Sequence, residues 1–469
     1  MRERSRCLGL ALVTGLLLGG GCGEGHFGDP SAPAAAHRGA DVLLLTVDTL
    51  RAQQLGIYGY GRPTTPRIDR FFADGIVYLR AYSTTASTSP SVISLLTGRL
   101  PQEHRVRLLY QLVPEDVKLI TNFLPLEYQT AAFVSNVVLS EEAMGIADRF
   151  DHYDDFVDEE DPSHSFFERS ARRTTDAALR WVRSSRDPER PLFLWVHYMD
   201  PHGPYHPPDD WARSFGHPRP EPIPKGRSIP PYQEEPGVTD GLDYVDRYDE
   251  EIAYMDAQVG RLLEGYAELH PIDDSLIVLT ADHGENMMEH EIWFTHGYHV
   301  YETIVRVPLL LSGPGVLAQR MELGSLGIDV APTILRFVGA EVPATMPSVD
   351  LRNGWGLDAK RVLLVDATQK QLQWRAAIQG QRKWMIRVRG RDREVSELRS
   401  YDLSADPGEE QPQGGDRGEP VPAQLLRLVR TDPDPAGIPS HYREGIRRTA
   451  PKVAPGVGAE ALEKLRALG

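Results

Sequence analysis

Four runs of apolar residues, each ending in a polar cluster, dominate the hydrophobic pattern of this chain. They cover residues 41–48, 130–136, 192–197 and 275–283. Near-continuous apolar runs of about five to seven residues are typical of strands buried on both faces, which predicts a parallel or mostly parallel sheet. Helical patterns lie between the runs, for example apolar residues at spacings of three and four between Tyr248 and Tyr266. Strands that alternate with helices predict a layered α/β domain.

We therefore expect an α/β/α sandwich around a large, mostly parallel mixed sheet, to which 306–311 adds a further strand. After Val349 the pattern changes to short strand-like segments, which predicts a small antiparallel sheet with a helix. The expected organisation is a large α/β domain over 40–345, a small α+β subdomain over 346–412, and a tail rich in charge, proline and glycine over 413–469.

The N-terminus has the pattern of an export signal. Three arginines precede an apolar stretch over 8–18, followed by three glycines and Cys22, which predicts a signal peptide over 1–22 that is shorter than a membrane span. Cys22 after the glycines resembles a bacterial lipobox and predicts an acylated Cys22. Ordinary secretion is the alternative, because Leu18 lies one position too far upstream. Residues 23–39, rich in Gly, Pro, Ala and Ser, predict a tether.

Composition narrows the location and the partners. Cys7 and Cys22 are the only cysteines, so the exported chain would have no disulfide and no catalytic thiol. The formal net charge of −16 makes nucleic acid an improbable partner. We expect an exported protein of the bacterial cell envelope, either periplasmic or an outer-membrane lipoprotein, that meets the membrane through its N-terminal lipid anchor.

Metal-type ligands follow two of the predicted strands. Asp48 ends the first run, and Asp282-His283-Gly284-Glu285 ends the last one. Ligands of parallel sheets bind beyond the carboxyl ends of the strands, where these side chains would converge. A single Asp after a strand is more often a helix cap. Two strands that deliver such residues at the same edge predict a binding site.

Thr88 is a candidate nucleophile. Ser89 suits the N-cap of a helix, Pro90 its first position and Gly98 its C-terminal cap. Thr88 would then lie at a helix N-terminus, where the dipole and free N–H groups favour negative charge. A threonine hydroxyl is a weak nucleophile unless a divalent metal lowers its pKa. From this segment alone, a helix cap and a nucleophile are equally good interpretations.

A series of motifs over roughly 40–410 resembles the sulfatase family of the alkaline phosphatase superfamily. In chain order they are Val47-Asp48-Thr49-Leu50-Arg51, Gly56-Ile57-Tyr58-Gly59-Tyr60, Thr64-Thr65-Pro66-Arg67-Ile68-Asp69, Thr88-Ser89-Pro90-Ser91, Leu95-Leu96-Thr97-Gly98-Arg99, His197-Tyr198-Met199-Asp200-Pro201-His202-Gly203, Ala281-Asp282-His283-Gly284-Glu285, His296-Gly297, Tyr301-Glu302, Asp329-Val330-Ala331-Pro332-Thr333 and Tyr401-Asp402-Leu403. The resemblance implies the family's α/β fold and hydrolysis of a sulfate, phosphate or phosphonate ester.

The departures from that family concern the reaction. Orthodox sulfatases carry Cys or Ser where this chain has Thr88, and Arg where it has Val92, in a Cys/Ser-x-Pro-x-Arg motif whose first residue is oxidised to formylglycine. Threonine cannot follow that route. Thr49 stands where the family often has a second metal-binding Asp. These changes resemble the Thr-nucleophile members, which include phosphodiesterases, phosphonate hydrolases and phosphoethanolamine transferases, and they favour a phosphorus ester.

The resemblance implies a metal centre made by Asp48, Thr88, Asp282 and His283. We expect one divalent ion. An imidazole among so few ligands favours zinc or manganese. Calcium, which the orthodox branch binds, prefers more oxygen ligands but stays possible.

The resemblance also implies roles around the metal. His202 and His296 would contact the ester oxygens or protonate the leaving group, and His296 occupies a position usually held by Lys. Asn136 and His197 would donate hydrogen bonds to a non-bridging oxygen. Arg99 would hold substrate, although a structural ion pair explains it equally well. The substrate class is a small-molecule, glycan or lipid ester.

Two other functions stay open. Val92 and Thr49 motivate a catalytically degenerate lipoprotein that binds a glycan or an anion without turnover. The second alternative is a transferase that passes the phosphoryl group to an alcohol. The loops over 140–175 and 205–240 would determine the leaving group.

Overall fold

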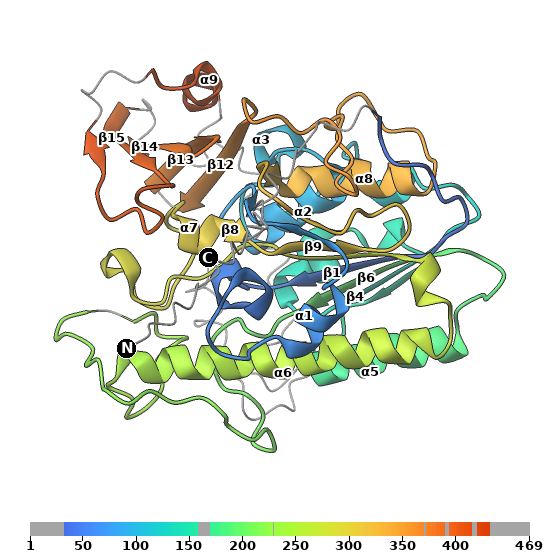
Figure 1. Cartoon of the computed structure of the whole chain (residues 1–469), viewed down its shortest axis with the longest axis horizontal. Coiled ribbons are helices and arrows are strands. Elements are labelled where there is room, and N and C mark those ends of the chain that lie inside the picture. Colours follow the sequence, from blue (N-terminus) through green and yellow to red (C-terminus); the bar gives the residue numbers. More distant parts are fainter. Residues whose placement is uncertain are drawn as a thin grey trace, which may run out of the picture.

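A mixed eight-stranded sheet forms the centre of the protein, with helices on both of its faces (Figure 1). The computed structural model describes residues 32–157, 169–227, 229–369, 372–389, 394–414 and 420–431. The predicted leader with Cys22, the first part of the predicted tether and the end of the predicted tail lie outside these residues. From edge to edge the strands are β10 (Gln319–Met321), β2 (Ile76–Tyr78), β9 (Leu309–Ser312), β7 (Leu276–Ala281), β1 (Val42–Val47), β6 (Leu192–Tyr198), β4 (Gln129–Val134) and β5 (His152–Asp154).

The four predicted apolar runs form adjacent strands in the middle of this sheet. They are β7, β1, β6 and β4, and all of their neighbouring pairs are parallel. Every residue of β1, β6 and β7 is buried, which explains why these sequences lack polar alternation. The predicted strand over 306–311 is divided. Arg306–Val307 forms β8 of a separate small sheet, and β9, which begins at Leu309 and extends to Ser312, runs antiparallel to β7 and β2. The expected mixed sheet is confirmed.

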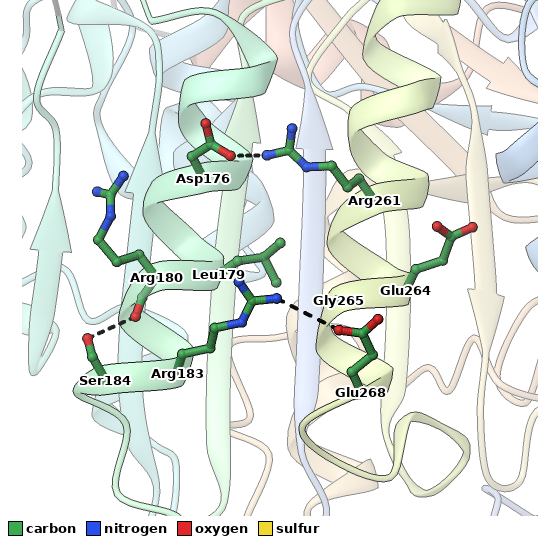
Figure 2. Close-up of a pocket in the computed structure, with 9 residues that line it drawn as sticks. All are labelled: Asp176, Leu179, Arg180, Arg183, Ser184, Arg261, Glu264, Gly265 and Glu268. Carbon is green, nitrogen blue, oxygen red and sulfur yellow. Dashed lines mark hydrogen bonds and ion pairs between the residues drawn. The ribbon is translucent and has the colours of Figure 1, made fainter.

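Helices cover the sheet on two sides (Figure 1). α5 (Ala171–Ser184) and α6 (Gly241–Ala267) cover one face, and α2 (Thr88–Thr97) and α8 (Val330–Phe337) cover the other. α5 and α6 pack closely where Gly265 has no side chain. A Cβ at that position would lie only 2.9 Å from Leu179 Cδ1. Figure 2 shows the groove between these two helices. The shorter helices are α1 (Pro66–Phe71), α3 (Pro101–His104), α4 (Glu141–Met144) and α7 (Glu302–Val305).

The predicted small antiparallel sheet is also present. It consists of β12 (Val362–Gln369), β13 (Leu372–Gln379), β14 (Arg382–Arg389), β15 (Glu394–Asp402) and β16 (Gln413–Gly414), and α9 (Ala423–Thr431) packs on it. β16 and α9 lie beyond the predicted limit of the subdomain at 412, so part of the predicted tail belongs to this sheet. A three-stranded sheet of β11 (Ser325–Leu326), β3 (Ala81–Tyr82) and β8 (Arg306–Val307), which the sequence did not predict, lies beside it. One apolar cluster joins Tyr82 and Val300 to Trp374 and Met385, so the small sheet shares a core with the large domain.

Candidate active site

Asp48 and Asp282 leave the sheet side by side. Val47, the last residue of β1, pairs with Ala281, the last residue of β7. His283 Nε2 lies 3.4 Å from Asp282 Oδ2 and 3.9 Å from Asp48 Oδ1. All three side chains are fully buried. The predicted convergence of ligands at the carboxyl ends of these strands therefore occurs.

The backbone around Asp282 fixes which of its oxygens faces the centre. Oδ1 accepts hydrogen bonds from His283 N at 2.8 Å and from Thr49 N at 3.2 Å. Thr49 adopts a φ of 53°, a conformation that β-branched residues rarely adopt. This turn aims the Thr49 amide at the carboxylate, which leaves Asp282 Oδ2 for the centre.

The glycine after His283 has a steric cause. A Cβ on Gly284 would lie 2.3 Å from the carbonyl oxygen of Thr303, so only glycine fits there. This close approach brings the 303–305 segment against the strand end and holds His283 in place. In the Asp-His-Gly sequence, Asp282 and His283 are therefore candidate metal ligands, and Gly284 is required for packing.

Thr88 opens α2 and points at the same centre. Its Oγ1 lies 3.3 Å from His283 Nε2. Ser91 Oγ donates to Asp282 O at 2.5 Å, which ties the first turn of the helix to the end of β7. The expectation that Ser89 is the N-cap is wrong, because the helix begins at Thr88 after Ser87, and Ser89 Oγ donates to Val138 O instead. Gly98 ends the helix with a φ of 63°, as predicted.

Two carboxylate oxygens at this centre lack a partner. Within the described residues, neither Asp48 Oδ1 nor Asp282 Oδ2 has a hydrogen-bond donor, although both are buried. Unpaired buried carboxylates are strongly unfavourable. Burial and the nearby charge of Asp48 raise the pKa of Asp282 to about 7. These observations fit a divalent cation, which would pair with both oxygens and with the imidazole.

Asn136 and His197 contact Asp48 on its other oxygen. Asn136 Nδ2 donates to Asp48 Oδ2 at 2.6 Å, and His197 Nε2 lies 3.4 Å from the same atom. His197 Nδ1 lies 2.8 Å from Thr46 Oγ1, which accepts a hydrogen bond from Trp195 Nε1 at 2.9 Å. Burial opposes the charge on Asp48, but the hydrogen bond with His197 and the surrounding imidazoles hold its pKa well below the usual range.

His202 and His296 lie next to the metal-type ligands. The ring centroids of His296 and His283 are 4.5 Å apart, and those of His202 and His296 are 5.2 Å apart. His296 Nδ1 lies 3.3 Å from each carboxylate oxygen of Glu285. Burial lowers the pKa of His202, and it lowers that of His296 to about 4. The sequence alone gives Glu285 no role, because no local pattern shows that the segment from 285 to 296 folds back on itself.

The similarity of this chain to known proteins establishes its family. A sulfatase family model matches residues 40–340. The chain belongs to the sulfatase family. It is therefore an ester-hydrolysing enzyme by family, and members of the family generally bind a divalent metal.

Relatives and solved structures agree with the sulfatase assignment. Human iduronate 2-sulfatase is 25% identical over 397 residues, which cover 66% of this chain and 70% of that protein. A solved structure in complex with its substrate D-glucosamine-2-N,6-O-disulfate aligns with a TM-score of 0.67 at 18% identity, over 87% of this chain and 98% of the other. The phosphonate monoester hydrolase of Agrobacterium radiobacter aligns with a TM-score of 0.62 at 17% identity, over 87% and 95%.

Neither Val92 nor Arg99 supplies a positive charge to the metal-type ligands in this structure. Val92 is fully buried in the apolar core, so this position offers no cation to an ester. Arg99 follows the last residues of α2, about 16 Å along the helix from Thr88, and donates to Glu103 O at 3.0 Å. The structure therefore does not bring Arg99 to the other candidate residues, and its contact with substrate stays a prediction.

A second group of metal-type side chains lies at the start of α6. It contains His217, Asp243 and Asp246. Hydrogen bonds to Asp246 and Asp240 raise the pKa of His217, and Arg62 pairs with Asp246 at 2.6 Å. Protein cations already balance these carboxylates, unlike the pair at the ends of β1 and β7.

Proposed function

We propose that this sulfatase-family protein is an exported, metal-dependent hydrolase in which Thr88 attacks a phosphate, phosphonate or sulfate ester. One observation supports this most directly. Thr88 Oγ1 faces His283 Nε2 beside two buried carboxylates whose inner oxygens have no hydrogen-bond donor among the residues described. A hydroxyl placed at such a centre at a helix N-terminus is suited to act as a nucleophile.

Asp48, Asp282, His283 and Thr88 would hold the cation. A divalent ion there would lower the pKa of the Thr88 hydroxyl, whose proton passes to water, and would draw charge from the ester oxygens. Zinc or manganese fits the imidazole-containing set best, and calcium is the alternative. Asn136 and His197 keep Asp48 oriented through their contacts with Oδ2.

Thr88 Oγ1 forms a bond to phosphorus or sulfur while the bond to the leaving oxygen breaks. The leaving oxygen takes a proton from His202 or His296. Burial keeps the pKa of both imidazoles low, and the approach of an anionic ester raises it, so the acid form arises when substrate is present. Water then attacks the Thr88 ester, and Thr88 leaves with a proton from that water.

Phosphorus is the favoured centre. A Thr88 ester cannot collapse to an aldehyde, so a second attack at the central atom must release the product. Val92 also removes the cation that orthodox sulfatases place near the anion. Phosphonate monoester hydrolases from Agrobacterium radiobacter and Silicibacter pomeroyi share the fold, at TM-scores of 0.62 and 0.64. Iduronate 2-sulfatase, a sulfate-ester enzyme by name, keeps sulfur as the alternative.

The location is part of the same proposal. The leader over 1–21 and Cys22 support export to the cell envelope and an acyl anchor. No described helix has the length and apolar character needed to cross a membrane.

The test is metal analysis of the purified protein with parallel turnover of aryl sulfate, aryl phosphate, bis-aryl phosphate and aryl phosphonate. We expect one bound divalent transition metal and highest turnover on a phosphorus ester. Asp282→Asn should lower metal content, whereas Asp74→Asn, an exposed control, should not. An absence of both metal and turnover would favour the anion-binding lipoprotein. New products in the presence of acceptor alcohols would favour the transferase.

A further inference from the structure

The chain from residue 32 to residue 40, which we call the strap, is bound along the surface of the folded protein. Arg352 Nη2 donates to Ala34 O at 2.9 Å, and Arg352 Nη1 donates to Ala35 O at 2.6 Å. His37 N donates to a carbonyl at the end of α8 at 2.6 Å. The sequence predicted a tether over 23–39, and the part that the structure describes is docked.

The binding site of the strap is built into the core. Arg352 is fully buried and pairs with Asp350 through two contacts of 3.0 and 2.6 Å. Asp350 Oδ2 also accepts from Ala34 N at 3.1 Å. A buried ion pair is stable only when its remaining hydrogen bonds are satisfied, and here the strap backbone supplies them. The upstream chain therefore leaves the protein from a fixed point.

The strap joins the amino end of β1, on the side of the sheet opposite the candidate active site. Tyr128 OH donates to Ala40 O at 2.7 Å, and β1 begins at Val42. The metal-type ligands lie beyond the other end of β1, about 23 Å away at the rise of an extended strand. Figure 1 shows the first, dark-blue part of the chain running past α8 before it enters β1.

Three exposed leucines lie at this same edge, on three separate loops. Leu126, immediately before β4, is 97% exposed. Leu269, between α6 and β7, is 37% exposed, and Leu317, after the antiparallel strand β9, is 52% exposed. β4 and β9 are four strand spacings apart, or about 19 Å. The strap ends at β1, between these two strands, and begins beside Leu317. Arg352 holds Ala34 and Ala35 and also accepts from Leu317 N at 2.9 Å through its carbonyl, so the chain exit lies next to Leu317.

We propose that this leucine edge, formed by Leu126, Leu269, Leu317 and the strap exit, rests on a lipid bilayer. The nine residues between Cys22 and residue 32 span at most about 35 Å when fully extended. An acyl anchor on Cys22 thus keeps this edge near the bilayer surface, where apolar side chains gain by partial insertion. The inference rests on the acylation proposed above and is independent of the ester chemistry.

The exposed charges at this edge are of mixed sign, so apolar contact would be the main source of the proposed attraction to a bilayer. Arg38, Glu127 and Asp273 are all exposed at this edge, and their signs are mixed. In the adjacent groove, Arg183 pairs with Glu268 at 3.8 Å (Figure 2). Binding should therefore occur on zwitterionic lipid and change little with salt. The carboxyl ends of β1 and β7, which carry the candidate metal ligands, then face away from the bilayer, which favours a water-soluble ester over one embedded in the membrane.

The experiment uses single cysteines, because the chain's own two cysteines precede the described residues and Cys22 is blocked when acylated. L126C, L269C and L317C of the full-length protein are labelled with a polarity-sensitive fluorophore and bound to phosphatidylcholine vesicles containing nitroxide-labelled lipid. Controls are L112C beside Gly145 at the end of α4, V395C on β15 and L426C on α9, at positions that are 42%, 49% and 37% exposed. Turnover of a soluble aryl ester is measured for all six variants.

Quenching at least several-fold stronger at the three edge positions than at the controls would support the leucine edge. Equal quenching at both sets, or none at the edge while the protein sediments with vesicles, would overturn it, as would full-length protein that does not bind vesicles. A dimer in vesicle-free solution that shields the edge labels would identify a second copy as the occupant instead. Loss of turnover in every variant and the wild type would count against the hydrolase alone.

Discussion

Asn136 Nδ2 and Asp48 Oδ2 are 2.6 Å apart, and this hydrogen bond joins the end of β4 to the end of β1 across the intervening strand β6. Asn136 Oδ1 accepts in turn from Val138 N at 3.0 Å, which fixes the amide's orientation. The amide thus holds a ligand carboxylate with its second oxygen facing the centre. Contacts of this kind set how well a ligand is presented to a metal.

Asn136→Ala should weaken metal binding by about 10–100-fold, because Asp48 loses the donor that orients it. Metal affinity measured by competition with a chelator tests this, with turnover recorded at saturating metal. Asn122→Ala is a matched control, since Asn122 acts only within its own short turn. Unchanged metal affinity would show that His197 alone orients Asp48.

Thr88→Val should abolish turnover while leaving the fold intact, because it removes the hydroxyl and keeps the shape of the side chain. Thr88→Ser should retain measurable turnover, since it keeps a hydroxyl at the same helix terminus. Steady-state rates and thermal unfolding of each variant provide the measurement. The control is Thr121→Val, whose hydroxyl has no partner within the described ranges. Full activity in Thr88→Val would exclude Thr88 as the nucleophile.

Removal of the metal should expose a contribution of Asp282 to stability that depends on pH with a definite sign. The pKa of Asp282 rises from its ordinary value near 3.8 to about 7 when the protein folds. Asp282 then binds more protons in the folded state than in the unfolded state between these values, so its contribution to stability falls as pH rises from about 4 to about 7. Buried histidines with lowered pKa values act in the opposite direction, so the measurement compares chelator-treated wild type with chelator-treated Asp282→Asn. Between pH 5 and pH 8 the wild type should lose more thermal stability than the variant.

Two comparisons sharpen this pH test. Added metal should restore more thermal stability at pH 8 than at pH 5, since the cation favours the ionised carboxylate. Asp282→Asn should remove the part of the pH dependence that comes from this carboxyl. The same pH dependence in metal-free wild type and metal-free Asp282→Asn would contradict the shared-carboxylate arrangement.

Thr46→Val should destabilise the protein without touching the candidate metal ligands. The substitution leaves Trp195 Nε1 and His197 Nδ1 without their shared partner, at a cost of about 1–3 kcal/mol for each buried group. Urea unfolding gives the free energy of unfolding directly. A change below about 0.5 kcal/mol would mean that water replaces the hydroxyl at these two groups.

The sequence predicted the strands and their convergence because both depend on local composition. An apolar run such as 42–47 has one stable placement, in the middle of a covered sheet, and whatever follows it must emerge at the carboxyl edge. Asp48, Asp282 and His283 could therefore be placed together without coordinates, whereas Thr88 joined them only through the resemblance to the sulfatase family.

The sequence could not predict contacts that depend on how loops close. Whether Asn136 and His197 face Asp48 depends on the order β7-β1-β6-β4, which no local pattern encodes. Glu285 meets His296 only because the residues between them fold back. Ser89 was predicted as an N-cap because serine is favoured at that position, but its hydroxyl donates to Val138 O, which is 49 residues away in the sequence.

The small antiparallel sheet supports the segment that carries Thr88, although it is synthesised much later. Asp366 of β12 accepts from Ala86 N at 3.2 Å through its carbonyl and donates to Thr84 O at 3.0 Å through its amide, just before the helix that begins at Thr88. The segment that presents Thr88 is thus braced by chain synthesised almost 300 residues later. A ribosome-bound fragment ending near residue 345 would contain every candidate ligand and still lack this brace. Activity should accordingly appear only once the last third of the chain has been made.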